Sequence, residues 1–442
     1  MNSMKHTSRL IKTVTDVLTC QTKRTVTSKS FNTRNVTGVA AQSRTRTTLV
    51  QEKDAEQRSL AQAAYYDEGL RMLHEHQRTS PSLNDLEDNY GPEMYAKNCE
   101  NFIGTVKVPT GLVSIKVNGK HANGIYTVPM ATTEGALVAS YNRGTKVINE
   151  AGGANVAFIR QRIIRAPVFE FNTVEEATMF QEFYEQPDTF VLIKSIAEKT
   201  TRHGKLHKVQ CNVHGTTVHT RMSYSSGDAS GQNMVTFASE PVCKWLHANA
   251  PVTPTAWYID CGHSLDKRSG TANFLDGRGA YVTGEVVLPR GLIEKRMHTS
   301  VEIIQQLNWH QIDNIFAGSQ ALNCQAANAL AAIFIATGQD PACVAESHLS
   351  FTQFKKTTEG DLQMICTIPS LMIGTIGGGT SLPSQKTCLD IIGTHGIGTM
   401  PTFAEVIMGV VMGGELSLIS AMGAQHFAYA HKKHARGPTA SS

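Results

Sequence analysis

Residues 406–424 read VIMGVVMGGELSLISAMGA, a mostly apolar stretch that carries a single acid, Glu415, near its middle. A helix of this length is long enough to cross a bilayer. A carboxylate at the bilayer centre costs about 2.5–3.5 kcal/mol, however, and the repeated glycines suit close packing against other protein elements. We therefore expect a buried helix in the core of a soluble protein rather than a membrane span.

Charge is unevenly distributed along the 442-residue chain. Residues 1–50 hold nine Lys and Arg and one acid, Asp16, which leaves 32 basic and 36 acidic side chains, a balance of −4, for the rest. This balance excludes a basic, nucleic-acid-binding body. The tail places Leu10, Val14 and Leu18 on one helical face beside Arg9, a pattern typical of a mitochondrial transit segment. A disordered basic tail on a cytosolic protein is the alternative.

The nine cysteines contain no CxxC pair and no spacing typical of metal ligands. Free thiols scattered in this way are typical of a protein from a reducing compartment. They predict neither a disulfide scaffold nor a zinc ribbon, and we expect no metal.

The periodicity of apolar residues and the positions of turn-forming Gly and Pro divide the chain into segments that differ in their expected secondary structure. Around residue 168 a run of helix, two strands and helix begins, which predicts a compact insert built on a small antiparallel sheet. Its expected elements are a helix over Val174–Tyr184, strands over Lys205–Val213 and Thr216–Ser225, and a helix from Gly231. The fold class is therefore α+β. The expected divisions are 1–50 (basic tail), 51–100 (helical region), 101–167 with 258–442 (large domain) and 168–257 (inserted domain).

The flanking segments mix helices with strands. Gly338 has the position of a helix C-terminal cap, because it follows an apolar helical run that ends near Ala336. The other expected elements are a helix over Asp54–His76, alternating strands from Val106 to Val117, a helix from near Thr133, a strand over Leu362–Ile368, and helices from Ser384 and over Phe403–His431.

Several short motifs contain groups that could carry chemistry. Glu134 stands at a helix N-terminus, where a carboxylate is favoured, and Asp266-Lys267-Arg268 forms a charged turn. Taken alone, each also suits a structural role, as a helix cap or a solvated turn. The run from Gly227 to Met234 could bring backbone close to a pyrophosphate. Gly377-Gly378-Gly379 is not a GxGxxG fingerprint, so no Rossmann domain is indicated.

The motifs become specific through their fixed order. Together they resemble hydroxymethylglutaryl-CoA (HMG-CoA) reductases of the eukaryotic-like class I, in a soluble form without a membrane domain. The resemblance covers roughly residues 95–436. The matching stretches are Cys99–Gly104, Pro129–Gly135, Ser140–Gly144, Asp228–Met234, Asp266-Lys267, Gly338–Asp340, Gly374–Thr380, Gly414–Leu418 and His431.

The resemblance implies a large helical domain around a long central helix, with a small ferredoxin-like α/β sandwich domain inserted in it. It implies two substrates, HMG-CoA and NADPH, although the residues themselves do not separate NADPH from NADH. It also implies a homodimer or homotetramer whose active sites lie between subunits. No nucleic acid or membrane partner is expected.

Carried over by position, the catalytic residues are Glu134, Lys267, Asp340 and His431. Reduction of a thioester to an alcohol takes two hydrides, and each attack generates an oxyanion that Lys267 can stabilise. Glu134 would supply a proton if burial kept it protonated. Asp340 would hold Lys267, and His431 would protonate the departing thiolate.

The resemblance also implies binding residues. Those for the substrate are Ser140, Asn142, Arg143, Arg165, Asp266, Arg268 and Asn328. Those for the cofactor are Asp228, Ser230, Gln232, Asn233, Gly377, Gly378 and Gly379.

Some positions depart from the family pattern, and many of them concern the substrate carboxylate. Asp260 replaces a Ser, Gln325 replaces a His, and Trp309 stands where a Lys is usual, although the alignment at Trp309 is loose. Losing a cation that pairs with a buried carboxylate costs about 2–5 kcal/mol. We therefore keep two alternatives: a reductase of the same mechanism that acts on an acyl-CoA without a free carboxylate, and a non-catalytic CoA- or NADPH-binding paralogue.

Overall fold

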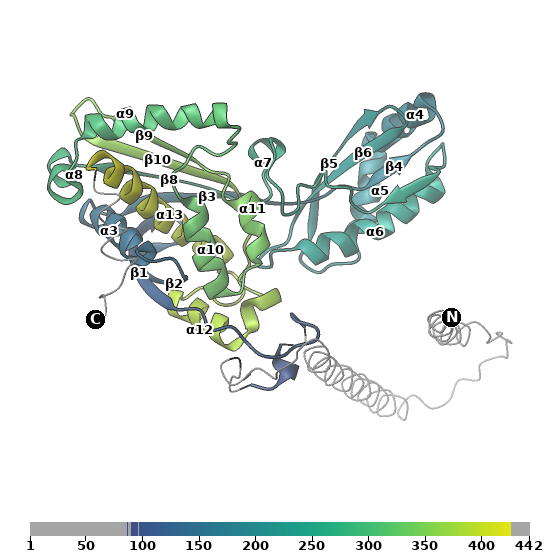
Figure 1. Ribbon diagram of the computed structural model, residues 1–442. Coiled ribbons are helices and arrows are strands. Elements are labelled where there is room, and N and C mark those ends of the chain that lie inside the picture. The colour runs from purple at the N-terminus through teal and green to yellow at the C-terminus, as the bar shows by residue number, and fades with distance from the viewer. Residues whose placement is uncertain (1–85, 87–89, 96, 426–442) are drawn as a thin grey trace, which may run out of the picture. The chain divides into compact units, whose positions relative to one another are not determined.

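The computed structural model describes residues 86, 90–95 and 97–425, all within one of two compact units (Figure 1). Three expectations lie outside these residues: the basic tail 1–50, the helix over Asp54–His76, and His431. In the part that is described, helices and antiparallel strands are mixed, and the described elements begin with a short 3₁₀ helix, η2 (Pro92–Met94).

A sheet forms the framework of the larger part. β3 (Ala154–Arg165) pairs antiparallel with β8 (Gly279–Leu288), and β8 pairs with β10 (Leu362–Leu371). β10 in turn pairs with β9 (Phe351–Lys356). On the other side, β1 (Thr110–Gly119) pairs antiparallel with β2 (Asn123–Ala131) and parallel with β3.

The stretch quoted first is helical and buried, as expected. It lies in α13 (Met400–Gly423), which starts three residues before the expected Phe403 and is buried from Phe403 to Ser417. α13 is the one described helix long and apolar enough to cross a membrane, and 83 % of its most apolar window is buried inside the protein. We therefore read it as a core helix.

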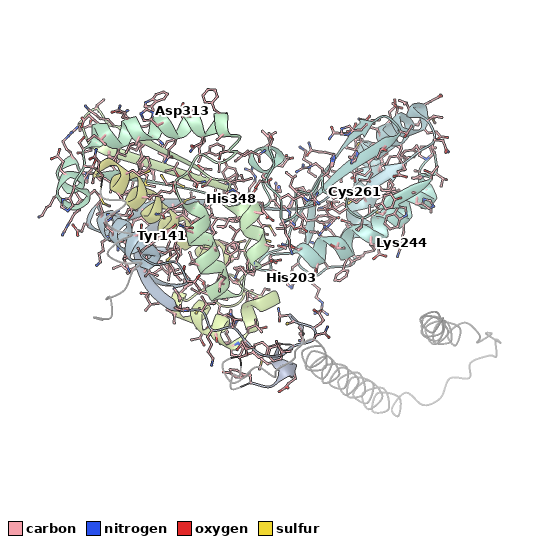
Figure 2. All side chains as sticks on the ribbon, in the orientation of Figure 1. Tyr141, His203, Lys244, Cys261, Asp313 and His348 are labelled. Carbon is pink, nitrogen blue, oxygen red and sulfur yellow. The ribbon has the colours of Figure 1, made fainter. Side chains whose placement is uncertain are left out.

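Glycines allow α13 to contact α3 (Leu137–Glu150) closely. A Cβ on Gly144 of α3 would overlap the carbonyl oxygen of Gly413, and a Cβ on Gly414 would overlap the ring of Tyr141, which Figure 2 labels. The expected close packing is therefore confirmed. α3 begins at Leu137 rather than near Thr133, because Ala136 before it has a left-handed backbone (φ 71°).

Two carboxylates are fully buried within α13, and both accept backbone N–H groups. Glu405 accepts from His121 and Ala122 in the β1–β2 turn, at 2.9 and 2.6 Å. Glu415 accepts from Cys324 and Gln325, both at 2.7 Å. Buried carboxylates are tolerated where such bonds replace water, so each one anchors a loop to the core helix.

The segment 168–257 carries its own antiparallel strands. Its elements run β4 (Val168–Glu170), α4 (Val174–Tyr184), α5 (Pro187–Glu198), β5 (Lys205–His214), β6 (Thr217–Ser225), α6 (Gln232–Asn249) and β7 (Ala256–Tyr258). The strands lie in the order β7-β4-β6-β5, and β6 also pairs with the end of β3. The expected helix Val174–Tyr184, both strands and the helix after Gly231 are confirmed. α5 was not foreseen.

The rest of the chain supplies helices and tight turns. α10 (Ala326–Thr337) ends at Gly338, whose φ of 70° confirms the expected cap. The remaining elements are α7 (Ala272–Leu275), α8 (Arg290–Met297), α9 (Val301–Ile312), η3 (Asp313–Ala317), η4 (Pro341–Cys343), α11 (Val344–Ser347), η5 (Gly378–Ser381) and α12 (Pro383–Ile392). The predicted strand Leu362–Ile368 lies in β10, and the helix predicted from Ser384 lies in α12.

Candidate active site

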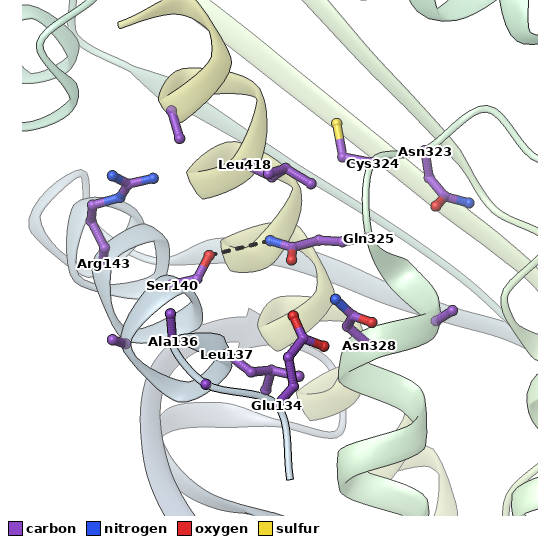
Figure 3. Close-up of a pocket in the computed structure, with 14 residues that line it drawn as sticks. Glu134, Ala136, Leu137, Ser140, Arg143, Asn323, Cys324, Gln325, Asn328 and Leu418 are labelled. Atoms are coloured by element: carbon purple, nitrogen blue, oxygen red, sulfur yellow. Dashed lines mark hydrogen bonds between the residues drawn. The ribbon is translucent and has the colours of Figure 1, made fainter. Parts of the chain in front are cut away.

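A first pocket, of about 440 Å³, lies where α3, α10 and α13 meet. We call it the Glu134 pocket. Figure 3 shows the side chains of Glu134 and Asn328 facing the same space between α3 and α10. Four of the predicted site residues line this pocket: Glu134, Ser140, Arg143 and Asn328. The other lining residues are Gly135, Ala136, Leu137, Ala139, Asn323, Cys324, Gln325, Ala327, Leu418 and Ala421.

Polar contacts fix one wall of the Glu134 pocket. The hydroxyls of Ser140 and Ser417 lie 3.0 Å apart, and the Nε of Arg143 donates to the Ser417 hydroxyl at 3.1 Å. Gln325 donates its amide to the carbonyl of Gly414 at 2.6 Å and to Ser140 at 3.4 Å (Figure 3). This wall is therefore held by a connected network of polar groups.

Glu134 itself lies outside that network. Its backbone N–H donates to the hydroxyl of Thr132 at 3.0 Å, and its side chain is exposed. The burial that would keep Glu134 protonated is not provided within the single chain, because the α3 N-terminus is open to solvent there. A covering group would have to come from outside the described chain.

A second pocket, of about 760 Å³, lies at the other end of α10. We call it the Gly-rich pocket, because the Gly377–Gly379 run and the loop before α6 line it. Predicted catalytic and cofactor residues meet here, namely Ser230, Gln232, Asn233, Lys267, Asp340, Gly377, Gly378 and Gly379. Gly231, Met234, Gln339, Cys343, Met372 and Thr380 line it too.

The Lys267 ammonium and the Asp340 carboxylate form an ion pair at 2.8 Å in the Gly-rich pocket. Both side chains are nearly half exposed (45 and 43 %). The hydrogen bond that Lys267 donates to Asp340 is the main reason why the pKa of Lys267 is raised. The lysine is therefore held as a cation whose head group still reaches solvent or a ligand.

The loop before Lys267 is fixed by a buried ion cluster. Asp266 contacts Arg278 at 2.8 Å, and Arg278 contacts Glu346 at 3.3 Å. Burial raises the pKa of Glu346 to about 7. Glu346 also accepts the backbone N–H of Lys267 at 3.4 Å, so this cluster holds the backbone of Lys267 in place.

Glycine is required at two points of the Gly-rich pocket. A Cβ on Gly374 would lie 2.5 Å from the backbone nitrogen of Ser230, and one on Gly338 would overlap Gly379. Gly377 and Gly378, in contrast, have positive φ and open space where a Cβ would be. The backbone thus forms a cradle whose open side belongs to the pocket.

The N-terminus of α6 opens into the same pocket. Its N-cap, Gly231, offers no side-chain cap for the first N–H groups of this 18-residue helix. An uncapped helix start with glycine before it favours a phosphate group. The residues present therefore fit a dinucleotide that lies along 230–234 and 377–379.

Arg165 is paired within the chain. Its guanidinium contacts Asp260 at 3.0 Å and Asp266 at 3.7 Å, and it donates to the carbonyl of Gln232 at 3.2 Å. The added acid at position 260 thus neutralises a cation that was predicted to bind substrate.

Several predicted residues line neither pocket. Asn142 donates to the carbonyl of Leu112 at 3.0 Å, and one carboxylate oxygen of Asp228 accepts the N–H of Met400 at 3.2 Å. Arg268 is exposed and lies over Gly262. Trp309 is 68 % exposed on α9 and lines neither pocket. His431 lies outside the described residues.

The Glu134 pocket and the Gly-rich pocket are separated by the length of α10. Asn328 lines the first pocket near the start of the helix, and Gly338, its C-terminal cap, lines the second. Ten helical steps span about 15 Å. Within one chain, Glu134 and the Lys267–Asp340 pair therefore lie at opposite ends of a helix.

Sequence reasoning missed the residues that support the site. Glu346, Arg278 and Ser417 bond to predicted site residues but were not singled out. A signal was available for Arg278 and Glu346, since charged residues within apolar surroundings require partners. Ser417 lies in the matching stretch Gly414–Leu418, but its residue type alone did not indicate the contact with Arg143.

Residues 66–436 match the family described as hydroxymethylglutaryl-coenzyme A reductase. The chain is 40 % identical over 350 residues to 3-hydroxy-3-methylglutaryl-coenzyme A reductase of Pyrococcus horikoshii, covering 77 % of this chain and 84 % of that one. It is 39 % identical over 380 residues to the enzyme of the same name from Methanothermobacter thermautotrophicus, covering 84 and 94 %. This chain belongs to the hydroxymethylglutaryl-coenzyme A reductase family.

The fold is similar to that of a solved bacterial structure. The class II HMG-CoA reductase from Streptococcus pneumoniae, solved bound to NADPH, aligns with a TM-score of 0.61 at 18 % identity. The alignment covers 74 % of this chain and 88 % of the bacterial chain. At this identity the likeness concerns the fold alone.

Proposed function

We propose that this chain reduces HMG-CoA to mevalonate and free CoA at the expense of two NADPH. The family match across residues 66–436 supports this activity. One thioester carbonyl accepts two hydrides and two protons, and the C–S bond breaks between the two reductions. The observation that carries the proposal is the Lys267–Asp340 pair beside a cradle that fits a dinucleotide.

In this scheme, Lys267 stabilises the oxyanion formed at the thioester carbon. A positioned cation of this kind contributes about 3–4 kcal/mol to a transition state. Asp340 keeps Lys267 charged and aimed into the Gly-rich pocket. Glu134 delivers a proton to the carbonyl oxygen, and His431 protonates the departing thiolate.

NADPH supplies the hydride when bound, and the Gly-rich pocket would hold it. The N-terminus of α6 would receive its pyrophosphate, and the Gly377–Gly379 run would pass beneath it. Ser230, Gln232 and Asn233 line the same wall. Asp228 would support this wall without lining the pocket. Its backbone carbonyl accepts the N–H of Thr375 at 2.8 Å and so joins the two Gly-rich segments.

We further propose that each active site forms between two subunits. In one chain α10 keeps Glu134 away from Lys267, and Glu134 is exposed. A second subunit that placed its Lys267 over Glu134 would unite the catalytic residues and bury the carboxylate. Ser140, Arg143 and Asn328 would then contact the substrate from one subunit, and Asp266 and Arg268 from the other.

Subunit mixing tests this arrangement. The Glu134→Gln and Lys267→Ala enzymes should both be inactive with HMG-CoA, as followed by NADPH absorbance. After mixing and subunit exchange of two dimers, about a quarter of the wild-type activity should return, because half of the mixed dimers' sites are intact. No recovery in a dimer shown to have exchanged would place the whole site in one chain.

We also assign the chain to class I and interpret residues 168–257 as a ferredoxin-like insert in the large domain. The archaeal relatives at 39–40 % identity, against 18 % for a class II enzyme, support class I. The strand order β7-β4-β6-β5 and the element order β4-α4-α5-β5-β6-α6-β7 support the ferredoxin-like insert. The burial of α13 supports a soluble enzyme.

The Arg165–Asp260 pair favours one second candidate, a reductase of an acyl-CoA that has no free carboxylate. An arginine already paired at 3.0 Å attracts a substrate carboxylate less. Purified full-length chain oxidising two NADPH per HMG-CoA would establish the first function. Turnover only with uncharged acyl-CoAs would establish the second, and NADPH binding without any turnover would indicate a non-catalytic paralogue.

A further inference from the structure

Three histidines that are distant in sequence meet at one corner of segment 168–263. One nitrogen from each of His214, His219 and His263 lies within 4.8 Å of the others. The rings of His219 and His263 are stacked, with centroids 3.9 Å apart and planes at 13°. The ring of His214 lies 4.9 Å from that of His219. This is the one such cluster of potential metal ligands among the described residues.

Backbone pairing brings the three side chains together. His214 ends β5 and pairs with Thr217 of β6, and His219 stands two residues further along β6, so both side chains lie on one face. On the other side of β6, Val168 of β4 pairs with His219 and also with Tyr258 of β7. The chain leaves β7 at Tyr258 and reaches His263 five residues later.

The loop that carries His263 is fixed on both sides. Asp260 binds Arg165 at 3.0 Å and accepts the N–H of Gly262 at 2.7 Å. The carbonyl of His263 accepts a hydrogen bond from Arg221 at 3.2 Å. His263 is therefore held beside the β5–β6 hairpin by contacts that do not use its ring.

One ring nitrogen of the cluster has no hydrogen-bond partner among the described residues. It is the buried Nδ1 atom of His219. Burial and the other two imidazoles lower the pKa of His219, and burial with His214 lowers that of His263. Neutral imidazole is the form that binds a metal ion. Arg221, whose charge also acts on His263, is paired with Asp276 at 3.2 Å.

We propose that His214, His219 and His263 bind a divalent transition-metal ion of the zinc class. Imidazole nitrogen suits Zn²⁺, Cu²⁺ and Ni²⁺, whereas Mg²⁺ and Ca²⁺ prefer oxygen. Three histidines leave a fourth position for water. Nitrogens around a tetrahedral zinc lie about 3.3 Å apart, so the three need to close by an ångström or so. His214, which is exposed at a strand end, can move toward the other two, and the stacked rings of His219 and His263 must turn relative to each other, because the ion lies in the plane of each ring that binds it.

The ion would tether a functional loop. Lys267 follows His263 by four residues, and Cys261, labelled in Figure 2, belongs to the same loop. A metal on His263 would join this loop to the β5–β6 hairpin. The site is independent of the proposed reduction, since none of the three histidines lines the Glu134 pocket or the Gly-rich pocket.

The test is metal titration of untagged full-length protein that has been stripped with a chelator. We expect one Zn²⁺ per chain, and at least a ~100-fold loss of affinity in His219→Gln and in His263→Gln, because a direct ligand contributes more than the 10–100-fold of its supporting partners. His207→Gln is the matched control, since His207 lies on β5 but bonds Ser225 at 2.9 Å. It should bind zinc as the wild type does.

Co²⁺ distinguishes histidine ligands from the free cysteines. The proposed site should give the visible absorption of tetrahedral cobalt without a thiolate charge-transfer band. Zinc should also slow hydrogen exchange in residues 259–268. If His219→Gln or His263→Gln is less stable than the wild type without metal, the variant of the exposed histidine, His214→Gln, decides. Absence of stoichiometric binding, a thiolate band, or unchanged affinity in these variants would overturn the proposal.

Discussion

The two ends of α10 are built in different ways. At its start, the Glu134 pocket is shaped by helices and by a fully buried carboxylate, Glu415, that accepts two backbone N–H groups. At its end, the Gly-rich pocket is shaped by loops, and its ion pair of Lys267 and Asp340 is nearly half exposed. The carboxylate that shapes the first pocket is thus part of the core, whereas the ion pair of the second pocket is exposed enough to be replaced with little effect on folding.

Replacement of Glu415 should have the largest effect. Glu415→Ala would leave two buried N–H groups unpaired, at about 1–3 kcal/mol each, and would add a cavity. We expect a loss of about 3–6 kcal/mol in the free energy of unfolding, measured by urea denaturation. Glu415→Gln, which keeps one acceptor oxygen, should lose less. Equal stability of Glu415→Ala and wild type would show that α13 does not anchor the 324–325 loop.

Replacement of Lys267, in contrast to that of Glu415, should lower activity without lowering stability. Lys267→Ala is expected to lower kcat by about 10²–10³, because it removes the cation that meets the oxyanion. The melting temperature should be unchanged, since an exposed ion pair contributes about 0–1 kcal/mol to stability. Asp340→Asn, which leaves the lysine but weakens its hold, should give a smaller loss of kcat. A large loss of stability in Lys267→Ala would remove the contrast between the pockets.

Glu346 makes the ion cluster behind Lys267 sensitive to pH. Its pKa is raised to about 7 in the folded chain from an ordinary 4.5, so the folded state binds this proton more tightly than the unfolded state. The contribution to stability is therefore complete below pH 4.5 and is lost as the pH rises through 7. A shift of this size corresponds to about 3 kcal/mol, which we take as an upper bound, because Arg278 opposes the rise.

Urea denaturation between pH 4 and 8.5 measures this linkage. In Glu346→Gln the carboxyl is absent, so the stability difference from the wild type should change between pH 4.5 and 7 and be flat above pH 8. A difference that stays constant across the whole range would mean that Glu346 is ionised throughout, as a permanent partner of Arg278.

The contact between α3 and α13 should tolerate no side chain at Gly414. Gly414→Ala places a methyl group against the Tyr141 ring, and overpacking of this kind costs about 1–3 kcal/mol. Gly291→Ala in α8 is the control, because no atom lies within 4 Å of its Cβ position. It should be neutral or stabilising by up to about 1 kcal/mol. Equal stabilities of the two variants would show that glycine at 414 is not required for packing.

Local patterns predicted most of the elements, and the family resemblance predicted many of the residues that line the two pockets. Helix caps such as Gly338, and the alternation in 205–225, are short-range signals that burial does not override. The exposure of Glu134 was not predictable, because it depends on which part of the molecule covers the α3 N-terminus. Nor was the meeting of His214, His219 and His263, which depends on the pairing of β4 with both β6 and β7. Pairing between strands that are distant in the sequence produces no recognisable residue spacing.

The smallest expected effect is on the KM for HMG-CoA, and it should distinguish two departures from the family pattern, Asp260 and Trp309. Asp260→Ser should free the Arg165 guanidinium, which Asp260 now holds at 3.0 Å, and should lower the KM for HMG-CoA by up to about tenfold, or 1.4 kcal/mol. Trp309→Lys should leave KM unchanged, because Trp309 is exposed on α9 and lines neither pocket.

Steady-state kinetics with HMG-CoA and with an uncharged acyl-CoA measure both variants. The gain in Asp260→Ser should be confined to the charged substrate, since only a carboxylate benefits from the freed cation. If Trp309→Lys lowered KM instead, a second subunit must bring residue 309 to the Glu134 pocket, and the departure at 309 would belong to the substrate site. If neither variant changed KM, Arg165 would serve to hold the loop before Lys267 rather than to bind substrate.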